Sequence, residues 1–193
     1  KLSTGDYVYY LNTDDYLFNC DTIESVVNRI PETARIFYGD IYLEDEGAFI
    51  ELFKTKKSLR SLRNGNMIHM QSVFIERELL VRVNGFDTRF SIIADNDLMI
   101  RVAKMINPTE IFHVNIPVAV FKKGGTSYGK PETVVKERKI MLKEQTNNLS
   151  YIFGITKYEL RKHIKKLPLL KTMYRKVRRR LYLIRNMIIE RSK

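Results

Sequence analysis

The sequence predicts an α/β protein with a mixed β-sheet flanked by helices, followed by a basic amphipathic helical tail. Three observations lead to this prediction. Apolar runs of strand length are interspersed with segments of helical periodicity, two of the runs form a hairpin pattern, and the excess positive charge lies at the C-terminal end. The 193 residues, 44% of them hydrophobic, suffice for one core with an appendage. We therefore expect one domain at residues 1–150 and the tail at residues 151–193.

The net charge of +12 is unevenly distributed. Residues 1–156 hold 20 of the 34 lysines and arginines and 20 of the 22 acidic residues, so residues 157–193 carry the whole excess. This asymmetry indicates an appended surface-binding segment rather than a fold that is basic throughout. The single cysteine, Cys20, excludes an internal disulfide, and no apolar run reaches the roughly 18–20 residues of a membrane span.

The first predicted element is a strand at Tyr7–Leu11, whose apolar run ends in Asn12, Asp14 and Asp15. A short apolar run bounded by turn formers is typical of a strand buried on both faces of a parallel sheet. Ligands of open α/β sheets bind beyond the carboxyl ends of strands, so two carboxylates here could hold Mg²⁺ or Mn²⁺. Asp and Asn are also ordinary turn formers, and the pattern alone leaves both interpretations open. Because an interior strand follows Lys1 so closely, we expect a fragment without its first strands.

A helix and a hairpin are predicted next. Asp21 followed by Glu24 is typical of a capping box, and the helix that it begins should end at Pro31. Its apolar face should consist of Ile23, Val26, Val27 and Ile30. Arg35–Leu43 and Ala48–Phe53 are strand-like and are joined by an acidic turn, which predicts a hairpin.

The remaining elements complete a mixed layout rather than a regular βαβ alternation. A short helix closed by Gly65 should precede a strand at Met67–Ile75, and a helix at Arg77–Val83 should end at the Asn-Gly pair that follows. Asp95 or a near neighbour should begin a helix that reaches about Met105. The last predicted elements of the domain are strands at Ile111–Val114 and Val118–Phe121 and a helix at Pro131–Gln145.

A second acidic cluster, Asp95 and Asp97, lies in the stretch A-D-N-D-L-M-I-R. As a purely structural residue, Asp95 would be the N-cap of a helix and accept hydrogen bonds from its first N–H groups. As a catalytic residue it would be a general base, since a carboxylate held there could accept the proton of an attacking hydroxyl. Arg101 lies four residues after Asp97, which predicts an ion pair within the helix.

Six segments, in order, resemble the inverting glycosyltransferases of family 2, which have the GT-A fold. They are T-G-D-Y-V-Y-Y-L-N-T-D-D-Y (Thr4–Tyr16), Y-G-D (Tyr38–Asp40), I-H-M-Q-S-V-F-I-E-R (Ile68–Arg77), G-F-D-T-R-F (Gly85–Phe90), A-D-N-D-L-M-I-R (Ala94–Arg101) and G-G-T-S (Gly124–Ser127). The resemblance implies a GT-A-like sheet truncated at the N-terminus, without the first strands that hold the nucleotide.

The resemblance also implies an activity. A sugar would pass, with inversion, from a nucleotide-diphosphate donor to a saccharide or lipid-linked acceptor, in surface polysaccharide biosynthesis and with Mn²⁺ or Mg²⁺ as cofactor. Asp14 and Asp15 would bind the metal, Asn12 and Asp14 would contact the donor, and Asp95 would be the catalytic base. The implied acceptor contacts are His69, Gln71 and Asp97.

The chain departs from the family pattern at three positions. Asn12 stands where the metal-binding motif begins with Asp, so Asp14 and Asp15 would carry those contacts. Ala94 stands where a Glu commonly precedes the catalytic aspartate. Met70 separates His69 from Gln71, so a half-buried histidine in a strand is the alternative to an acceptor contact.

The tail carries one apolar stripe at helical spacing, interrupted at Pro168, and its other faces are rich in Lys and Arg. Such a helix at residues 157–193 predicts binding to an anionic membrane surface, and a cytoplasmic protein peripheral on the inner face of the cytoplasmic membrane. The stripe could instead pack on the body. Nucleic acid is disfavoured as a partner because the body has no reader motif. The rival to an enzyme is a non-catalytic membrane- or nucleic-acid-associated module whose acidic clusters are turns and helix caps.

Overall fold

The computed structural model describes residues 3–45, 48–122, 130–147 and 156. The chain divides into two compact units, Lys1–Asn148 and Leu149–Lys193, and the strands and helices that follow belong to the first. Apart from Thr156, the predicted tail lies outside the described residues, as does the Gly124–Ser127 loop. Within the described residues, no helix combines the length and the apolar character that a membrane span requires.

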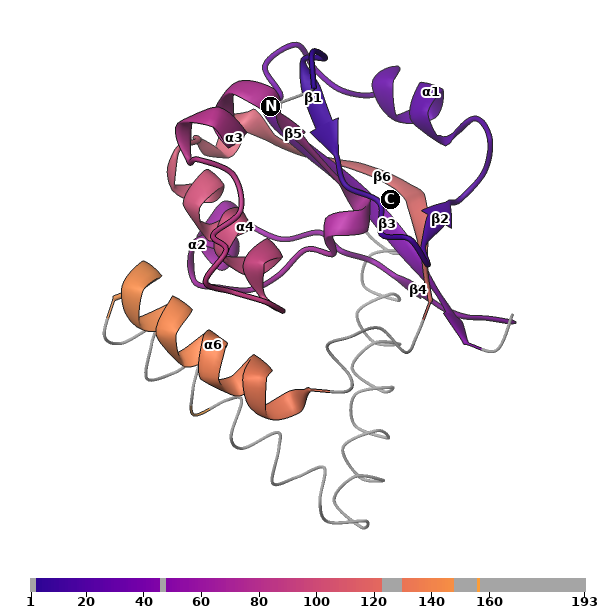
Figure 1. Cartoon of the computed structure of the whole chain (residues 1–193). Helices are drawn as coiled ribbons and strands as arrows, with labels where there is room; N and C mark the ends of the chain where they lie inside the picture. The colour runs from indigo at the N-terminus through magenta and orange to yellow at the C-terminus, as the bar shows by residue number, and fades with distance from the viewer. Residues whose placement is uncertain (1–2, 46–47, 123–129, 148–155, 157–193) are drawn as a thin grey trace, which may run out of the picture. The chain divides into compact units, whose positions relative to one another are not determined.

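The unit is built on a mixed sheet with the strand order β1-β5-β3-β6-β2, to which β4 adds by pairing with β3 (Figure 1). Among the described strands, β3 and β6 pair in parallel and all other pairs are antiparallel. The strands are β1 (Tyr7–Tyr9), β2 (Tyr16–Leu17), β3 (Ile36–Asp45), β4 (Ala48–Phe53), β5 (Val73–Glu76) and β6 (Ile111–Lys122). The mixed sheet and the β3–β4 hairpin confirm the α/β part of the predicted fold class.

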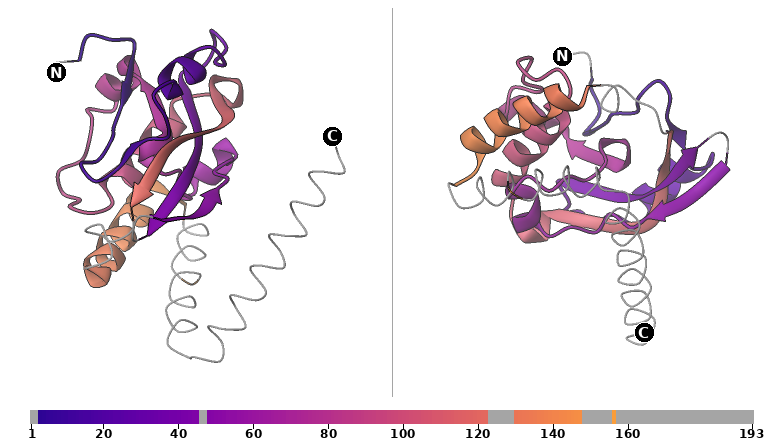
Figure 2. Two further views of the ribbon diagram at one scale, coloured as in Figure 1. Left: turned by 90° about the vertical axis from the view of Figure 1, so that its right-hand side faces the viewer. Right: turned by 90° about the horizontal axis from the view of Figure 1, so that it is seen from below.

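Helices lie on both faces of this sheet (Figures 1 and 2). One face carries α1 (Thr22–Val27), and the other carries α2 (Leu59–Arg63), α3 (Arg77–Arg82) and α4 (Ala94–Lys104), with α6 (Pro131–Gln145) beside α4. Two 3₁₀ turns, η1 (Met70–Ser72) and η2 (Pro108–Glu110), complete the described elements. The bounds of α6 match the prediction, and Gly65 with φ of 78° closes the short helix as expected.

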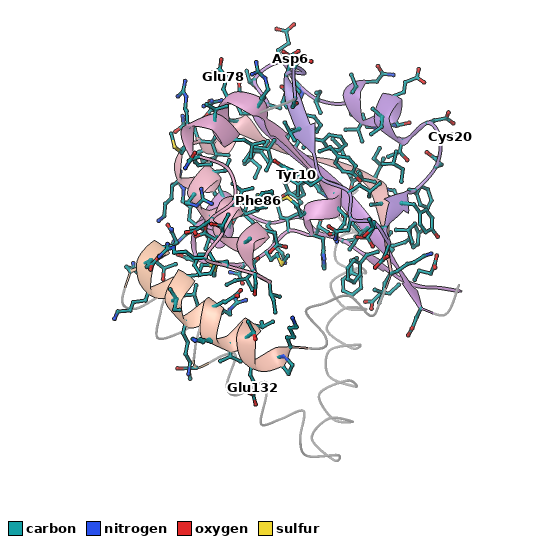
Figure 3. All side chains as sticks on the ribbon, viewed as in Figure 1. Asp6, Tyr10, Cys20, Glu78, Phe86 and Glu132 are labelled. Atoms are coloured by element: carbon teal, nitrogen blue, oxygen red, sulfur yellow. The ribbon has the colours of Figure 1, made fainter. Side chains whose placement is uncertain are left out.

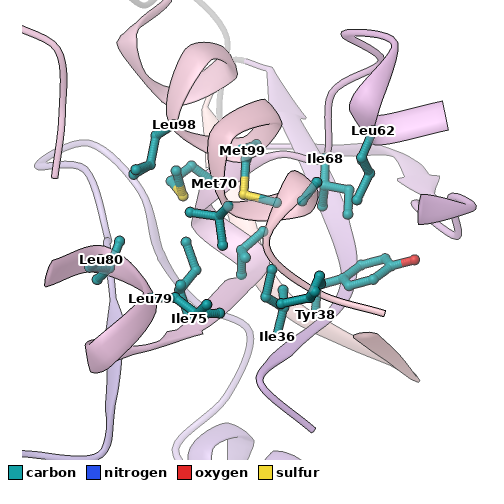
Figure 4. Close-up of a cluster of buried hydrophobic side chains, with 14 of the residues drawn as sticks. Ile36, Tyr38, Leu62, Ile68, Met70, Ile75, Leu79, Leu80, Leu98 and Met99 are labelled. Carbon is teal, nitrogen blue, oxygen red and sulfur yellow. The ribbon is translucent and has the colours of Figure 1, made fainter. Parts of the chain in front are cut away.

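Two buried clusters hold the helices on the sheet. On β3, Ile36 and Tyr38 point into the larger cluster under α2, α3 and α4, whereas Phe37 points into the smaller one under α1. Successive strand residues face opposite sides, so one strand serves both cores. Figure 4 shows the larger cluster, in which Met70 of η1 and Met99 of α4 lie close together.

The prediction that the first strand is buried on both faces of a parallel sheet is wrong for the described residues. β1 pairs antiparallel with β5 at the end of the strand order, and its side chains are only partly buried. Tyrosine hydroxyls explain the difference, because Tyr7 and Tyr9 donate hydrogen bonds to the carbonyl oxygens of Ala34 and Gln71. Strands β3 and β5 are instead buried on both faces.

Helix α1 differs from its prediction in cap, length and face. Asp21 occupies the N-cap position but makes no side-chain capping bond, and the last helical residue is Val27 rather than a residue at Pro31. The local anchor is instead Thr22, whose hydroxyl exchanges hydrogen bonds with Asn19. Val26 is fully buried, but Ile23 and Val27 of the predicted apolar face are exposed.

Two predicted boundaries also changed. The Met67–Ile75 strand is shortened by η1, so His69 is the N-cap of a 3₁₀ turn rather than a strand residue. The two strands predicted on either side of Asn115 are one continuous strand, β6. Its pairing with β3 shifts register at Asp40, and Asn115 adopts φ of 56° within this irregular stretch.

Gly39 makes this register shift possible. A Cβ atom at Gly39 would lie 2.4 Å from Cγ2 of Val118 and 2.5 Å from the carbonyl oxygen of Ile116. The two parallel strands therefore approach more closely than any side chain allows. The shift brings Nε2 of His113 to 2.9 Å from Oδ1 of Asp40, which also accepts the Thr55 N–H.

We predict that Gly39→Ala destabilises the protein by about 3 kcal/mol, because the added methyl group meets backbone as well as side chain. Urea unfolding followed by circular dichroism measures the change. Gly5→Ala is the control, since the nearest atom to a Cβ there is 3.7 Å away. Equal unfolding midpoints for the two variants would contradict the close approach of β3 and β6.

Candidate functional site

Hydrogen bonds of Asp15 stabilise the acidic turn after β1, at residues 12–15. The Asp15 N–H donates to the Asn12 carbonyl oxygen, and the Asn12 side-chain amide donates to Oδ2 of Asp15 at 3.2 Å. Oδ1 of Asp15 accepts the backbone N–H of Lys122, at the end of β6, at 3.0 Å. Both oxygens of this buried carboxylate therefore serve the structure, and they tie the end of β1 to the end of β6.

Asp14 has a different environment. Its side chain is exposed, and the structure describes no hydrogen bond or ion pair for it. Within the described residues, no three His, Cys, Asp or Glu side chains gather as a ready-made metal site. Asp14 is thus the acid of this turn whose lone pairs are available to a ligand, and a bound cation would take most of its ligands from water or substrate.

Lys122 strengthens the same junction through its side chain. Its ammonium group lies 3.8 Å from Oε1 of Glu44 and 5.5 Å from the centre of the Tyr16 ring. The Tyr16 hydroxyl donates a hydrogen bond to the same Glu44 carboxylate. The sequence analysis did not identify Lys122, because its partners are 78 or more residues away and no local pattern marks them.

The predicted acceptor residues His69 and Gln71 lie beside this turn. Burial, with the nearby charge of Lys57, lowers the pKa of His69, while the Asp15 carboxylate opposes the shift. His69 is therefore neutral at pH 7, and its ring lies between those of Phe53 and Phe121, at centroid distances of 6.0 and 5.7 Å. Gln71 is joined to β1 because its carbonyl oxygen accepts the Tyr9 hydroxyl at 2.6 Å.

Asp95 lies at the second residue of α4 rather than at the N-cap, which is Ile93. This corrects the predicted capping role, although the carboxylate still accepts the Asn96 N–H at 2.8 Å. Partial burial raises the pKa of Asp95 to about 6, and the hydrogen bonds from the backbone N–H groups of Asn96 and of Asp95 itself oppose the shift. An acid with this pKa is ionised at pH 7 but poised to take up a proton, as a general base requires.

Asp97 is held entirely by protein groups. Its Oδ2 accepts the Arg101 Nε at 2.7 Å, which confirms the predicted pair, and its Oδ1 accepts the Gln145 amide at 3.2 Å. Arg101 also donates to the carbonyl oxygens of Val83 and Gly85. The buried pair therefore fixes the loop before α4, and the acceptor contact expected from Asp97 stays a prediction.

One packing contact joins the segment that carries Asp14 to the loop before α4, and a second joins α4 to the turn that carries the predicted acceptor residues. The Tyr10 ring at the end of β1 meets the Phe86 ring edge to face, with centroids 5.0 Å apart (Figure 3). Met99, one helical turn after Asp95, shares the larger buried cluster with Met70, which lies between the two predicted acceptor residues. No hydrogen bond between Asp95 and Asp14 or Asp15 is among the described contacts.

Curated relatives match about two thirds of the chain. A PGL/p-HBAD biosynthesis glycosyltransferase of Mycobacterium tuberculosis (strain ATCC 25618 / H37Rv) is 28% identical over 141 residues, covering 69% of this chain and 50% of the relative. A PGL/p-HBAD biosynthesis glycosyltransferase of Mycobacterium bovis has the same identity and coverage. The chain thus spans about half the length of the curated relatives it matches. No protein-family model matches the chain.

The fold is similar to that of solved structures. The crystal structure of S. aureus TarS 1–349 superposes with a TM-score of 0.50 at 13% identity, covering 72% of this chain and 40% of TarS. The complex of the same protein with UDP-GlcNAc superposes with a TM-score of 0.51 at 15% identity, covering 72% and 42%. The chain is therefore a distant homologue of glycosyltransferases, with a mixed α/β sheet and helices that resemble the TarS fold.

We predict that Asp95→Asn becomes more stable relative to the wild type as the pH rises from about 4 to about 7.5. The pKa of Asp95 is about 6 in the folded state and near 4 in the unfolded chain, so the folded state binds more protons between these values. The wild type therefore loses stability between pH 4 and pH 6, by about 1–2 kcal/mol, and the Asn variant lacks this loss. Thermal midpoints at pH 4 and pH 7.5 test this. A midpoint difference between variant and wild type that is unchanged, or larger at pH 4, would contradict the raised pKa.

Proposed function

We propose that this chain is the C-terminal portion of an inverting, metal-dependent glycosyltransferase of family 2 with a GT-A fold. The observation that carries the proposal is that two acids have carboxylate oxygens without a described protein partner. Asp14 is exposed and without a described partner, and Asp95 is kept partly buried at a cost that raises its pKa. The distant homology to glycosyltransferases supports the same activity.

The proposed donor is a nucleotide-diphosphate sugar. The complex of TarS with UDP-GlcNAc supports this class of donor, although it leaves the sugar and the nucleotide open for this chain. Asn12 and Asp14 would contact the diphosphate beyond the end of β1. The chain spans about half of its curated relatives, so we propose that the nucleotide is held mainly by a part of the protein outside this sequence.

Mn²⁺ or Mg²⁺ is the proposed cofactor. Asp14 fits a hard cation, because its carboxylate oxygens are exposed and have no described partner. Asp15 fits less well, because its two oxygens already accept the Asn12 amide and the Lys122 N–H. We therefore propose Asp14 as the principal ligand and Asp15 as the residue that shapes the turn. The bound ion would neutralise charge that develops on the leaving diphosphate.

Asp95 is the proposed general base. Its carboxylate would accept the proton of an acceptor hydroxyl while the hydroxyl oxygen forms a bond to the anomeric carbon. The bond from that carbon to the diphosphate would break on the opposite face, so the configuration would invert, by the logic that applies to inverting glycosidases. Neutral His69 could exchange a hydrogen bond with a sugar hydroxyl, and Gln71 lies beside it.

The acceptor is proposed to be a saccharide or a lipid-linked saccharide used in surface polysaccharide biosynthesis. Attachment to the inner face of the cytoplasmic membrane would come from residues 157–193, which lie outside the described part of the chain. A non-catalytic module would explain the structural roles of Asp15 and Asp97. It would not explain why burial raises the pKa of Asp95 to about 6 even though the carboxylate accepts backbone N–H groups in the first turn of α4.

We predict that the protein containing this chain transfers sugar in the presence of Mn²⁺ or Mg²⁺ and stops when the ion is chelated. Asp95→Asn should reduce kcat at least about 100-fold, because the base is removed, and leave the Kd of the donor unchanged. Release of nucleoside diphosphate from a panel of sugar nucleotides, UDP-GlcNAc included, measures the rate. Cys20→Ser, at an exposed residue, is the control. Full activity of Asp95→Asn would remove the proposed base.

A further inference from the structure

Glu137, on α6, accepts four hydrogen bonds from three consecutive residues of another segment. It is 7% exposed, and its two oxygens face the turn that precedes α4. Oε1 accepts the Ser91 N–H at 2.9 Å and the Ser91 hydroxyl at 2.7 Å. Oε2 accepts the N–H groups of Ile92 at 3.0 Å and of Ile93 at 3.2 Å.

One of these contacts satisfies a group at the start of α4, the N–H of the N-cap residue Ile93, and the others hold the two residues before it. The first N–H groups of a helix have no acceptor within the helix, and the N-cap Ile93 has no side chain that could supply one. Glu137 supplies the acceptor from a different helix, and Asp95 accepts the Asn96 N–H further into the first turn. Two carboxylates thus divide the donors at the positive end of the α4 dipole.

Glu137 is ionised when it does this. Burial alone would raise the pKa of Glu137, but the hydrogen bonds from Ser91, Ile92 and Ile93 outweigh it and lower the pKa. A buried negative charge therefore binds the backbone of three consecutive residues, the last of which lies two positions before Asp95. A charge-assisted bond of this kind is about twice as strong as one between neutral groups.

Other residues of α6 hold the same segment. Glu144 and Asp87 share the Arg89 guanidinium at 2.9 and 2.7 Å, and the Gln145 amide reaches Asp97. Helix α6 thus contacts the chain before the turn, at the turn and after it. Its carboxylate at position 137 is the central contact and, unlike Arg89, is buried.

We propose that Glu137 is a positioning residue: it fixes the Ser91–Ile93 turn and thereby sets the orientation and burial of the Asp95 carboxylate. This inference rests on the proposed function of Asp95 as the base. It adds to that function a residue 42 positions later in the chain, which lies outside all six segments that resemble the family. Loss of the Glu137 contacts should free the turn, admit water to Asp95 and remove the main cause of its raised pKa.

The test compares Glu137→Gln with Glu132→Gln, which removes the same charge from an exposed position on the same helix (Figure 3). The pKa of Asp95 is read by NMR from its side-chain carboxyl carbon, which does not depend on activity. We expect a fall of about one unit in Glu137→Gln and no change in Glu132→Gln. The acidic limb of the kcat profile should move to lower pH by the same amount, and kcat at pH 7.5 should fall about 10-fold with the donor KM unchanged.

A purely structural role predicts something different. Glu137→Gln would then lower the thermal midpoint but leave the Asp95 pKa and the pH profile of the folded protein unchanged, and this result would overturn the proposal. If Glu137→Gln does not fold, Glu137→Asp decides, because it keeps the charge and shortens the reach. An Asp95 pKa between those of the wild type and an ordinary aspartate supports the proposal, and an unchanged pKa overturns it.

The two hypotheses fail separately. A shifted Asp95 pKa in Glu137→Gln, together with full activity of Asp95→Asn, would uphold the positioning role and reject the catalytic one. A lost activity in Asp95→Asn, together with an unshifted pKa in Glu137→Gln, would do the reverse.

Discussion

A buried carboxylate needs protein donors in place of water, and this constraint organises the first unit of the protein. Asp15 accepts the Lys122 N–H, Asp40 accepts the Thr55 N–H, and Glu137 accepts three N–H groups in succession. Each bond joins elements far apart in the sequence, so the acids connect strand ends and helix starts that apolar packing alone would leave adjustable. The same constraint sorts the acids by role. Asp15 and Glu137, with both oxygens occupied, hold the fold, as does Asp40, whose Oδ1 contacts both Thr55 and His113. Asp14 and Asp95 each retain an oxygen that could act on a ligand.

Much of the fold could be predicted because its signals are local. The hairpin, the helix that Gly65 closes and the helix that begins at Pro131 each depend on residues within a few positions of one another. The errors came where distant partners decide. The apolar run of β1 indicated an interior strand, but its tyrosine hydroxyls reach Ala34 and Gln71 and its neighbour is β5. Likewise, two strands were predicted on either side of residues 115–117, whereas the absence of a side chain at Gly39 lets one long strand continue through them.

The residues of the candidate site could be predicted from the sequence, but the separate roles of its acids could not. Residue types and spacing identified both acidic clusters, and the i,i+4 pair of Asp97 with Arg101 followed from helix geometry. Residue type and spacing did not distinguish Asp14 from Asp15, because the difference lies in the bonds that Asp15 accepts from the Asn12 amide and from the backbone N–H at position 122. Glu137 could not be identified for a similar reason, since it is one of three glutamates in a helix rich in charged residues and local sequence does not separate it from a solvated residue. The similarity to glycosyltransferases gives these residues a common context, at an identity too low to transfer substrates.

The proposed function requires the turn after β1 and the start of α4 to serve one site, and paramagnetic broadening by Mn²⁺ tests this requirement most directly. In a ¹⁵N-labelled sample with a substoichiometric amount of Mn²⁺, the amide signals of residues 12–15 and of residues 91–97 should broaden together. Asp14→Asn should abolish the broadening of both groups. Broadening limited to residues 12–15, or unchanged in Asp14→Asn, would show that the two acids do not share a site.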